Sequence, residues 1–155
     1  MKKLISYLSM ALLVVLTSCS GGDKEEEKFN AAETQALITQ YDANGGTLTS
    51  EEYSVLIKNT HLLFADIKQQ MKELLDITDH KEFMQKYELL KQDKQFIDEI
   101  TIREQVWRVL ILGQKGFSEE NKIEFGNLPE ECQLIDYYDD CIIARVDENT
   151  DSIAK

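Results

Sequence analysis

Proline and glycine are scarce in this sequence, which has one proline, Pro129, and seven glycines among its 155 residues. A protein built from many short strands needs frequent turns, and these two residues gather in turns. Their scarcity therefore disfavours a β-sandwich and favours helices. We expect an all-α domain.

Basic residues are also few, because 17 Lys and Arg stand against 29 Asp and Glu, a formal net charge of −12 at pH 7. Such a surface repels the phosphates of nucleic acids and of anionic lipid headgroups. We therefore expect no nucleic-acid partner and no electrostatic grip of the domain on a membrane. The charge fits a solvated acidic surface, and recognition of a basic partner is the alternative.

Residues that bind metals or attack substrates are sparse. His61 and His80 are the only histidines, and the sequence has no H-E-x-x-H motif or cysteine cluster for zinc. It has no G-x-S-x-G, no Gly-rich phosphate loop and no Ser-x-x-Lys. We predict no metal, no cofactor and no catalytic residue, and an enzyme or an enzyme inhibitor is the alternative class.

Residues 42–53 faintly resemble an EF-hand calcium loop. Asp42 and Asn44 match the first and third ligand positions of that loop. Thr47 stands where the loop needs glycine, and Tyr53 stands where it needs a bidentate glutamate. We interpret the segment as a turn followed by a helix cap.

A long apolar run lies at the N-terminus. Lys2 and Lys3 precede it, residues 4–16 are mostly apolar, and the run ends in Leu-Thr-Ser-Cys at Leu16–Cys19. This is the length of a signal-peptide core and less than the roughly 20 residues of a membrane-spanning helix.

Leu16–Cys19 resembles the lipobox of bacterial lipoproteins. The resemblance implies that residues 1–18 are a cleaved signal peptide, that the Cys19 thiol receives a diacylglyceryl group, and that the new amine is acylated in turn. Two or more acyl chains hold a protein stably on a membrane. A plain secreted protein with a chance cysteine and a single-pass signal anchor are the alternatives.

Residues 19–30 are polar and charged, and we expect a flexible tether. Within it, Lys24–Glu27 (Lys-Glu-Glu-Glu) resembles the acidic export tag of surface lipoproteins in Bacteroidota, which implies display on the cell surface. A plain spacer on a periplasm-facing protein is the alternative. Ser20 replaces the aspartate associated with inner-membrane retention in enteric bacteria, which favours the outer membrane.

The remaining chain predicts an irregular bundle of four to five helices in a domain of residues 31–147, followed by a disordered tail at 148–155. The strongest apolar stripe runs from Tyr53 to Leu75 and predicts the central helix. Trp107 is assigned to the core. The helices are expected over 31–41, 50–76, 80–91 and 94–114, with a short turn over 118–125 and a last helix from Pro129.

Cys132 and Cys141 are a candidate disulfide, because an exported compartment permits one. In a continuous helix, however, nine residues separate their Cα atoms by roughly 13.5 Å, whereas a disulfide needs less than about 7 Å. Either the last helix is continuous and the thiols are free, or it breaks and they can pair. Residues 141–146 are β-branched enough that a strand is a competing prediction.

The sequence thus predicts an envelope lipoprotein with a small, non-catalytic helical domain that binds a partner or serves an accessory role. The partner would be an envelope protein, a peptide or a glycan. A structural module that self-associates is a further alternative.

Replacing Cys19 tests the anchor directly. The variant Cys19→Ser should leave an unprocessed chain without acyl groups, because only a thiol accepts the diacylglyceryl group. Mass spectrometry of the N-terminus, together with fractionation after a high-salt wash, measures this. If the variant stays with membrane lipid after the wash, the lipid-anchor hypothesis is wrong.

Overall fold

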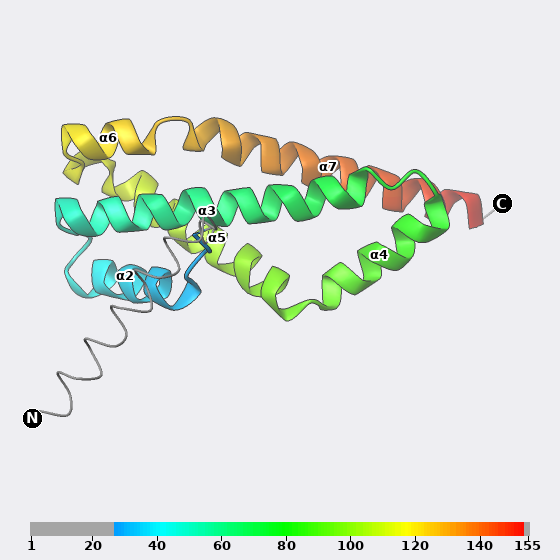
Figure 1. Cartoon of the computed structure of the whole chain (residues 1–155), viewed down its shortest axis with the longest axis horizontal. Helices are drawn as coiled ribbons and strands as arrows, with labels where there is room; N and C mark the ends of the chain where they lie inside the picture. The colour runs from blue at the N-terminus through cyan, green and yellow to red at the C-terminus, as the bar shows by residue number, and fades with distance from the viewer. Residues whose placement is uncertain (1–26, 154–155) are drawn as a thin grey trace, which may run out of the picture.

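The computed structural model describes residues 27–153, and this range is helical with no strand (Figure 1). Five of its α-helices have 13 or more residues. The prediction of an all-α irregular bundle is therefore confirmed. In chain order the elements are α2 (Ala31–Ala43), α3 (Ser50–Leu75), α4 (His80–Gln92), α5 (Lys94–Gly113), the 3-10 turn η1 (Gln114–Gly116), α6 (Glu119–Phe125) and α7 (Leu128–Ile153).

Helix α3 is the centre of the bundle and packs against α2, α4, α5, α6 and α7. Figure 1 shows α3 and α7 side by side and running in the same direction, with α4, α5 and α6 making the return connection. The buried face of α3 matches the predicted stripe. It consists of Tyr53, Leu56, Ile57, Asn59, Thr60, Leu63, Phe64, Ile67, Met71 and Leu74.

Side chains cap the starts of four helices. Thr49 accepts a hydrogen bond from the Glu52 amide while the Glu52 carboxylate accepts one from the Thr49 amide, so the capping box is present. The side chains of Asp79, Asp93 and Ser118 cap α4, α5 and α6, each accepting a hydrogen bond from the backbone amide three residues later.

Helix α5 buries a face that overlaps only in part with the one its apolar residues suggest. Ile97 and Ile111, which its apolar pattern placed on the buried face, are 46% and 43% exposed. Buried instead are Glu99, Ile102, Val106, Val109, Leu110 and Gly113. The end of α5 approaches α3 closely at Gly113, where a Cβ atom would lie 2.8 Å from the Tyr53 hydroxyl. The buried side of α5 therefore includes Gly113, where there is no room for a side chain, and also Glu99.

Helix α7 is continuous from Leu128 to Ile153, so the strand prediction for residues 141–146 is wrong. Pro129 lies in its first turn, where a missing amide hydrogen costs nothing. The helix also continues beyond Asp147, after which the sequence indicated a disordered tail. Arg145 joins it to the end of α3, because its guanidinium donates to the carbonyl oxygens of Leu75 and Ile77 at 3.0 and 2.7 Å.

The end of the expected tether is packed against the domain. Glu27 forms an ion pair with Lys58 of α3 at 2.8 Å. Phe29 is half-buried against the core, and the Asn30 side chain accepts a hydrogen bond from Glu33 at the start of α2. Residues 27–30 have no regular secondary structure, and burial of Phe29 and capping by Asn30 hold this end of the segment against the domain.

Among residues 27–153, no helix is both long enough and apolar enough to cross a membrane.

Truncating a side chain in the core should lower the free energy of unfolding far more than truncating one on the surface. Phe64 is fully buried, so Phe64→Ala should lower the free energy of unfolding by about 3–5 kcal/mol, as large-to-small core substitutions do. Ile123 is 79% exposed, so the matched variant Ile123→Ala should change it by less than about 0.5 kcal/mol. Urea denaturation followed by circular dichroism measures both values. Equal losses would contradict this assignment of the core.

Candidate functional site

The predicted lipid-attachment residue and its motif lie outside the described residues. This holds for Leu16–Cys19, for the signal peptide at residues 1–18 and for most of the Lys24–Glu27 tag. Glu27 is the part of that tag that the structure describes, and it is exposed and paired with Lys58.

Cys132 and Cys141 are free thiols on α7. Cys132 is buried against the core, and Cys141 is half-buried. The helix between them does not break, so the geometry that would allow a disulfide is absent. Of the two alternatives, the structure shows the continuous helix with unpaired thiols.

The segment that resembles an EF-hand forms a turn and a helix cap. Both carboxylate oxygens of Asp42 accept hydrogen bonds from the Arg108 guanidinium, at 3.1 and 3.0 Å. Gly45 and Gly46 adopt positive φ angles of 73° and 91°, which glycine tolerates without strain. Asp42 therefore fastens α2 to α5, and its hydrogen bond raises the pKa of Arg108 above the ordinary value, outweighing the opposing effect of burial.

The two histidines take separate structural positions. Nε2 of His61 lies 2.7 Å from the Glu124 carbonyl oxygen, and its Nδ1 lies 3.7 Å from the Glu131 carboxylate. His80 starts α4 and stacks on Phe83 with ring centroids 6.1 Å apart. Within residues 27–153 no group of three His, Cys, Asp or Glu side chains is arranged to hold a metal ion.

A cleft between α5 and α7 was not predicted from the sequence. Arg103 donates to the Asp136 carboxylate, and its Nη2 lies 3.6 Å from the Cys132 sulfur. Burial lowers the pKa of Arg103, but these two hydrogen bonds outweigh it and the pKa is raised. The cleft is lined by Met71, Ile100, Arg103, Glu104, Trp107, Cys132, Asp136 and Asp139.

The guanidinium in this cleft is occupied by its own protein partners, so the cleft is better suited to joining α5 and α7 than to binding an anion. Trp107, at its edge, is half-buried between Phe64 and Phe125, each with its ring centroid 6.0 Å away. It packs against the core as predicted.

Glu99 is a carboxylate in the interior, 2% exposed. It accepts hydrogen bonds from Gln95 at 2.9 Å and from Gln70 at 3.0 Å. Burial raises its pKa above the ordinary value, and the nearby charge of Asp66 adds to the rise. Perturbed acids often mark functional sites, but here both carboxylate oxygens face amide donors of the bundle.

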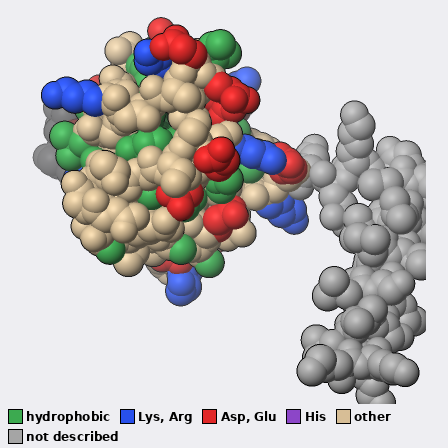
Figure 2. All heavy atoms as spheres, turned by 90° about the vertical axis from the view of Figure 1, so that its left-hand side faces the viewer, with side chains coloured by type: hydrophobic (Ala, Val, Ile, Leu, Met, Phe, Trp, Pro, Cys, Tyr) green, Lys and Arg blue, Asp and Glu red, His purple; other side chains and the backbone are tan. Residues whose placement is uncertain are grey.

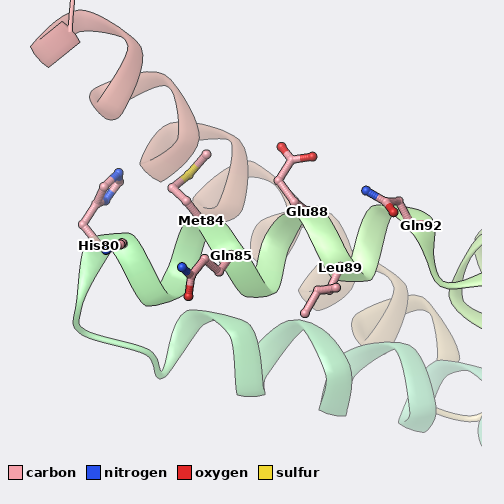
Figure 3. Close-up of a pocket in the computed structure, with 7 residues that line it drawn as sticks. His80, Met84, Gln85, Glu88, Leu89 and Gln92 are labelled. Atoms are coloured by element: carbon pink, nitrogen blue, oxygen red, sulfur yellow. The ribbon is translucent and has the colours of Figure 1, made fainter.

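An apolar groove runs along the exposed side of α4 (Figure 3). We call this surface the α4 face. In Figure 3, Met84 and Glu88 point to one side of the helix and Leu89 to the other. Leu89 is 66% exposed, although it is a large apolar side chain. The α4 face consists of His80, Lys81, Met84, Gln85, Glu88, Leu89 and Gln92.

No protein-family model matches the chain, and neither a curated protein nor a solved structure does.

Sequence reasoning missed the Arg103 cleft and the buried Glu99, as well as the α4 face. Only Glu99 left a signal, because it stands three and seven residues before Ile102 and Val106, in register with an apolar stripe. In the sequence, the residues of the α4 face look like an ordinary polar helix surface that also carries one methionine and one leucine.

The variant Glu99→Gln should change how stability depends on pH. A carboxyl group with a raised pKa in the folded state binds more protons folded than unfolded, so stability falls as pH rises from about 4.3 towards the folded pKa. A glutamine side chain cannot ionise, so this contribution should disappear and the variant should gain stability relative to the original chain as pH rises.

Urea denaturation at several pH values between about 4 and 8 tests this, with the difference between the two proteins plotted against pH. A difference that does not change with pH would show that Glu99 ionises as freely as an exposed carboxyl group. The exposed acid Glu104, changed to glutamine, is the control for removing one acidic side chain from α5.

Proposed function

We propose that this protein is an envelope lipoprotein, anchored by acyl chains on Cys19, whose helical domain binds a partner and does not catalyse a reaction. The observation that carries the proposal is the Leu-Thr-Ser-Cys motif at Leu16–Cys19, placed where the apolar N-terminal run ends. The outer membrane is the proposed location. The order of residues Lys24–Glu27 supports display on the cell surface.

The domain would lie close to the bilayer. Eight peptide steps separate Cys19 from Glu27, and a chain of that length spans at most about 29 Å. From Glu27 onward the chain is packed against the domain through Lys58, Phe29 and the Asn30 cap. A partner would therefore meet the domain within one protein diameter of the membrane.

The placement of polar groups supports binding rather than catalysis. A catalytic site needs several polar groups that converge on a concave surface reached by substrate. In this domain Glu99 faces Gln70 and Gln95, and Arg103 faces Asp136. These groups are engaged with one another, whereas the α4 face carries Met84, Leu89 and neutral glutamines beside the charged Lys81 and Glu88.

The acidic charge narrows the class of partner. With a net charge of −12, the chain favours an uncharged or basic partner over an acidic polymer. Figure 2 shows acidic side chains distributed around apolar ones at one end of the bundle. An envelope protein, a peptide or a neutral glycan fits this surface. Turnover of any envelope polymer by the purified protein would displace the proposal in favour of an enzyme.

Surface display is tested by changing the proposed export tag. Replacing Lys24–Glu27 with alanines should reduce cleavage by a protease added to intact cells, because the chain would remain on the periplasmic side. The amount of intact protein on immunoblots measures this. Unchanged cleavage would remove the export tag from the proposal while leaving the lipid anchor in place.

The structure supplies a matched control for that experiment. The tag replacement also removes the ion pair between Glu27 and Lys58. Lys58→Ala removes the same pair but keeps the tag, so it should leave protease access on intact cells unchanged. A loss of access in both variants would mean that the ion pair, and not the tag, is responsible.

A further inference from the structure

We infer that the α4 face binds a second copy of this chain, as an antiparallel pair of α4 helices related by a two-fold axis. The inference goes beyond the proposed function, because it names an interaction surface and its occupant and does not depend on how Cys19 is modified. It is carried by the order of charges and apolar residues along α4.

A two-fold interface must be complementary to itself, since the same patch occurs on both sides. On an α-helix, residues seven apart lie about 20° apart around the axis and roughly 10.5 Å apart along it. Lys81 and Glu88 have this spacing, so a lysine and a glutamate lie in one line on the α4 face. Turning such a helix end to end exchanges the two charges.

The axis that pairs these charges passes between Met84 and Gln85. In an antiparallel pair centred there, Lys81 of each copy lies opposite Glu88 of the other, which gives two equivalent ion pairs. Met84 and Gln85 of the two copies then meet around the axis. Methionine adapts readily to irregular contacts, and glutamine amides can both donate and accept hydrogen bonds. The centre of the α4 face is therefore complementary to its own two-fold copy.

The charge of the whole molecule favours this face over others for self-association. Two chains that each carry a formal net charge of −12 repel one another over most of their surfaces. Lys81 and Glu88 cancel within the α4 face, and Gln85 and Gln92 are uncharged. Repulsion between other parts of the two molecules falls off over about 8–10 Å at physiological ionic strength. The α4 face thus lets two copies approach without bringing like charges into contact.

The contact is small, because α4 has 13 residues and stable complexes bury about 1,200–2,000 Å². We therefore expect weak pairing in solution. If the chain is anchored as proposed, confinement to a membrane raises the effective concentration and favours the pair.

Disulfide cross-linking of the full chain in intact cells tests the pairing. In Met84→Cys, two new thiols would face each other near the two-fold axis, and oxidation should yield a dimer on non-reducing gels. Lys86→Cys is the matched control, because Lys86 is an exposed residue of the same helix that lies outside the α4 face and lines a hollow with Gln70 and Glu73 of α3. The dimer yield should be at least several-fold greater for Met84→Cys.

Charge exchange then tests the register. In the Met84→Cys chain, either Lys81→Glu or Glu88→Lys should reduce the dimer several-fold, because each places two pairs of like charges together. Both changes combined should restore it. Glu88 also pairs with Lys91 of its own helix at 3.2 Å, but an exposed pair of this kind contributes little, so recovery in the double variant reports the contact between copies.

Three results would overturn the inference. The first is a Met84→Cys dimer no more abundant than the Lys86→Cys dimer. The second is a dimer that does not respond to the charge changes. The third is a cross-linked product whose mass shows a different protein, which would assign the α4 face to another partner. None of these results bears on acylation of Cys19, so the anchor proposal stands or falls separately.

Discussion

Burial of α3 along nearly its whole length is the constraint on which the rest of the domain depends. The helix contacts five others, and its apolar stripe is wide enough that no single neighbour can cover it. Each of the other five helices therefore packs a narrower apolar face of its own against α3. Even the polar residues of the stripe are accommodated, since the Thr60 hydroxyl donates to the Leu56 carbonyl oxygen at 2.7 Å and Asn59 donates to Glu33 at 2.9 Å.

The ionisable groups inside the bundle serve to join helices. Arg145 donates to the carbonyl oxygen of Leu75, the last residue of α3, and to that of Ile77 just beyond it, with its guanidinium carbon 3.9 Å from the centre of the Phe83 ring. Arg103 joins α5 to α7, and Glu99 is held by Gln70 of α3. Among the described residues, no buried side-chain nitrogen or oxygen lacks a hydrogen-bond partner. Because these groups satisfy one another, the features left for outside partners are on the surface, above all the α4 face.

The proposed anchor and the observed domain meet at Glu27. A lipid on Cys19 with a short connection would make the membrane part of the protein's environment, and packing of Phe29 would limit how the domain turns above it. A weak pairing surface is then sufficient, since molecules confined to one membrane meet far more often than molecules in solution. The proposed anchor and pairing surface together would hold a small acidic domain in place without a large interface.

The candidate surfaces were only partly visible in the sequence. The proposed acyl-chain site at Cys19 rests on local motif order, which is why it can be proposed without knowledge of the fold. The α4 face could not be read in this way, because only the packing shows that Phe83 is buried while Leu89 is exposed and Met84 is half-buried at the edge of the core. The same holds for Arg103 and Asp136, which are 33 residues apart and meet only when α5 and α7 pack.

The sequence by itself determined the local features: the all-α class, the helix boundaries marked by Thr49, Asp79, Asp93 and Ser118, and the buried stripe of α3. These depend on spacing and on hydrogen bonds between residues three or four apart, which need no distant partner. Tertiary structure decided which face of α5 is buried, whether α7 continues, and that residues 27–30 pack against the domain. Each of these outcomes depends on contacts between segments far apart in the chain, such as Gly113 with Tyr53 and Arg145 with Leu75, and local pattern carries no information about them.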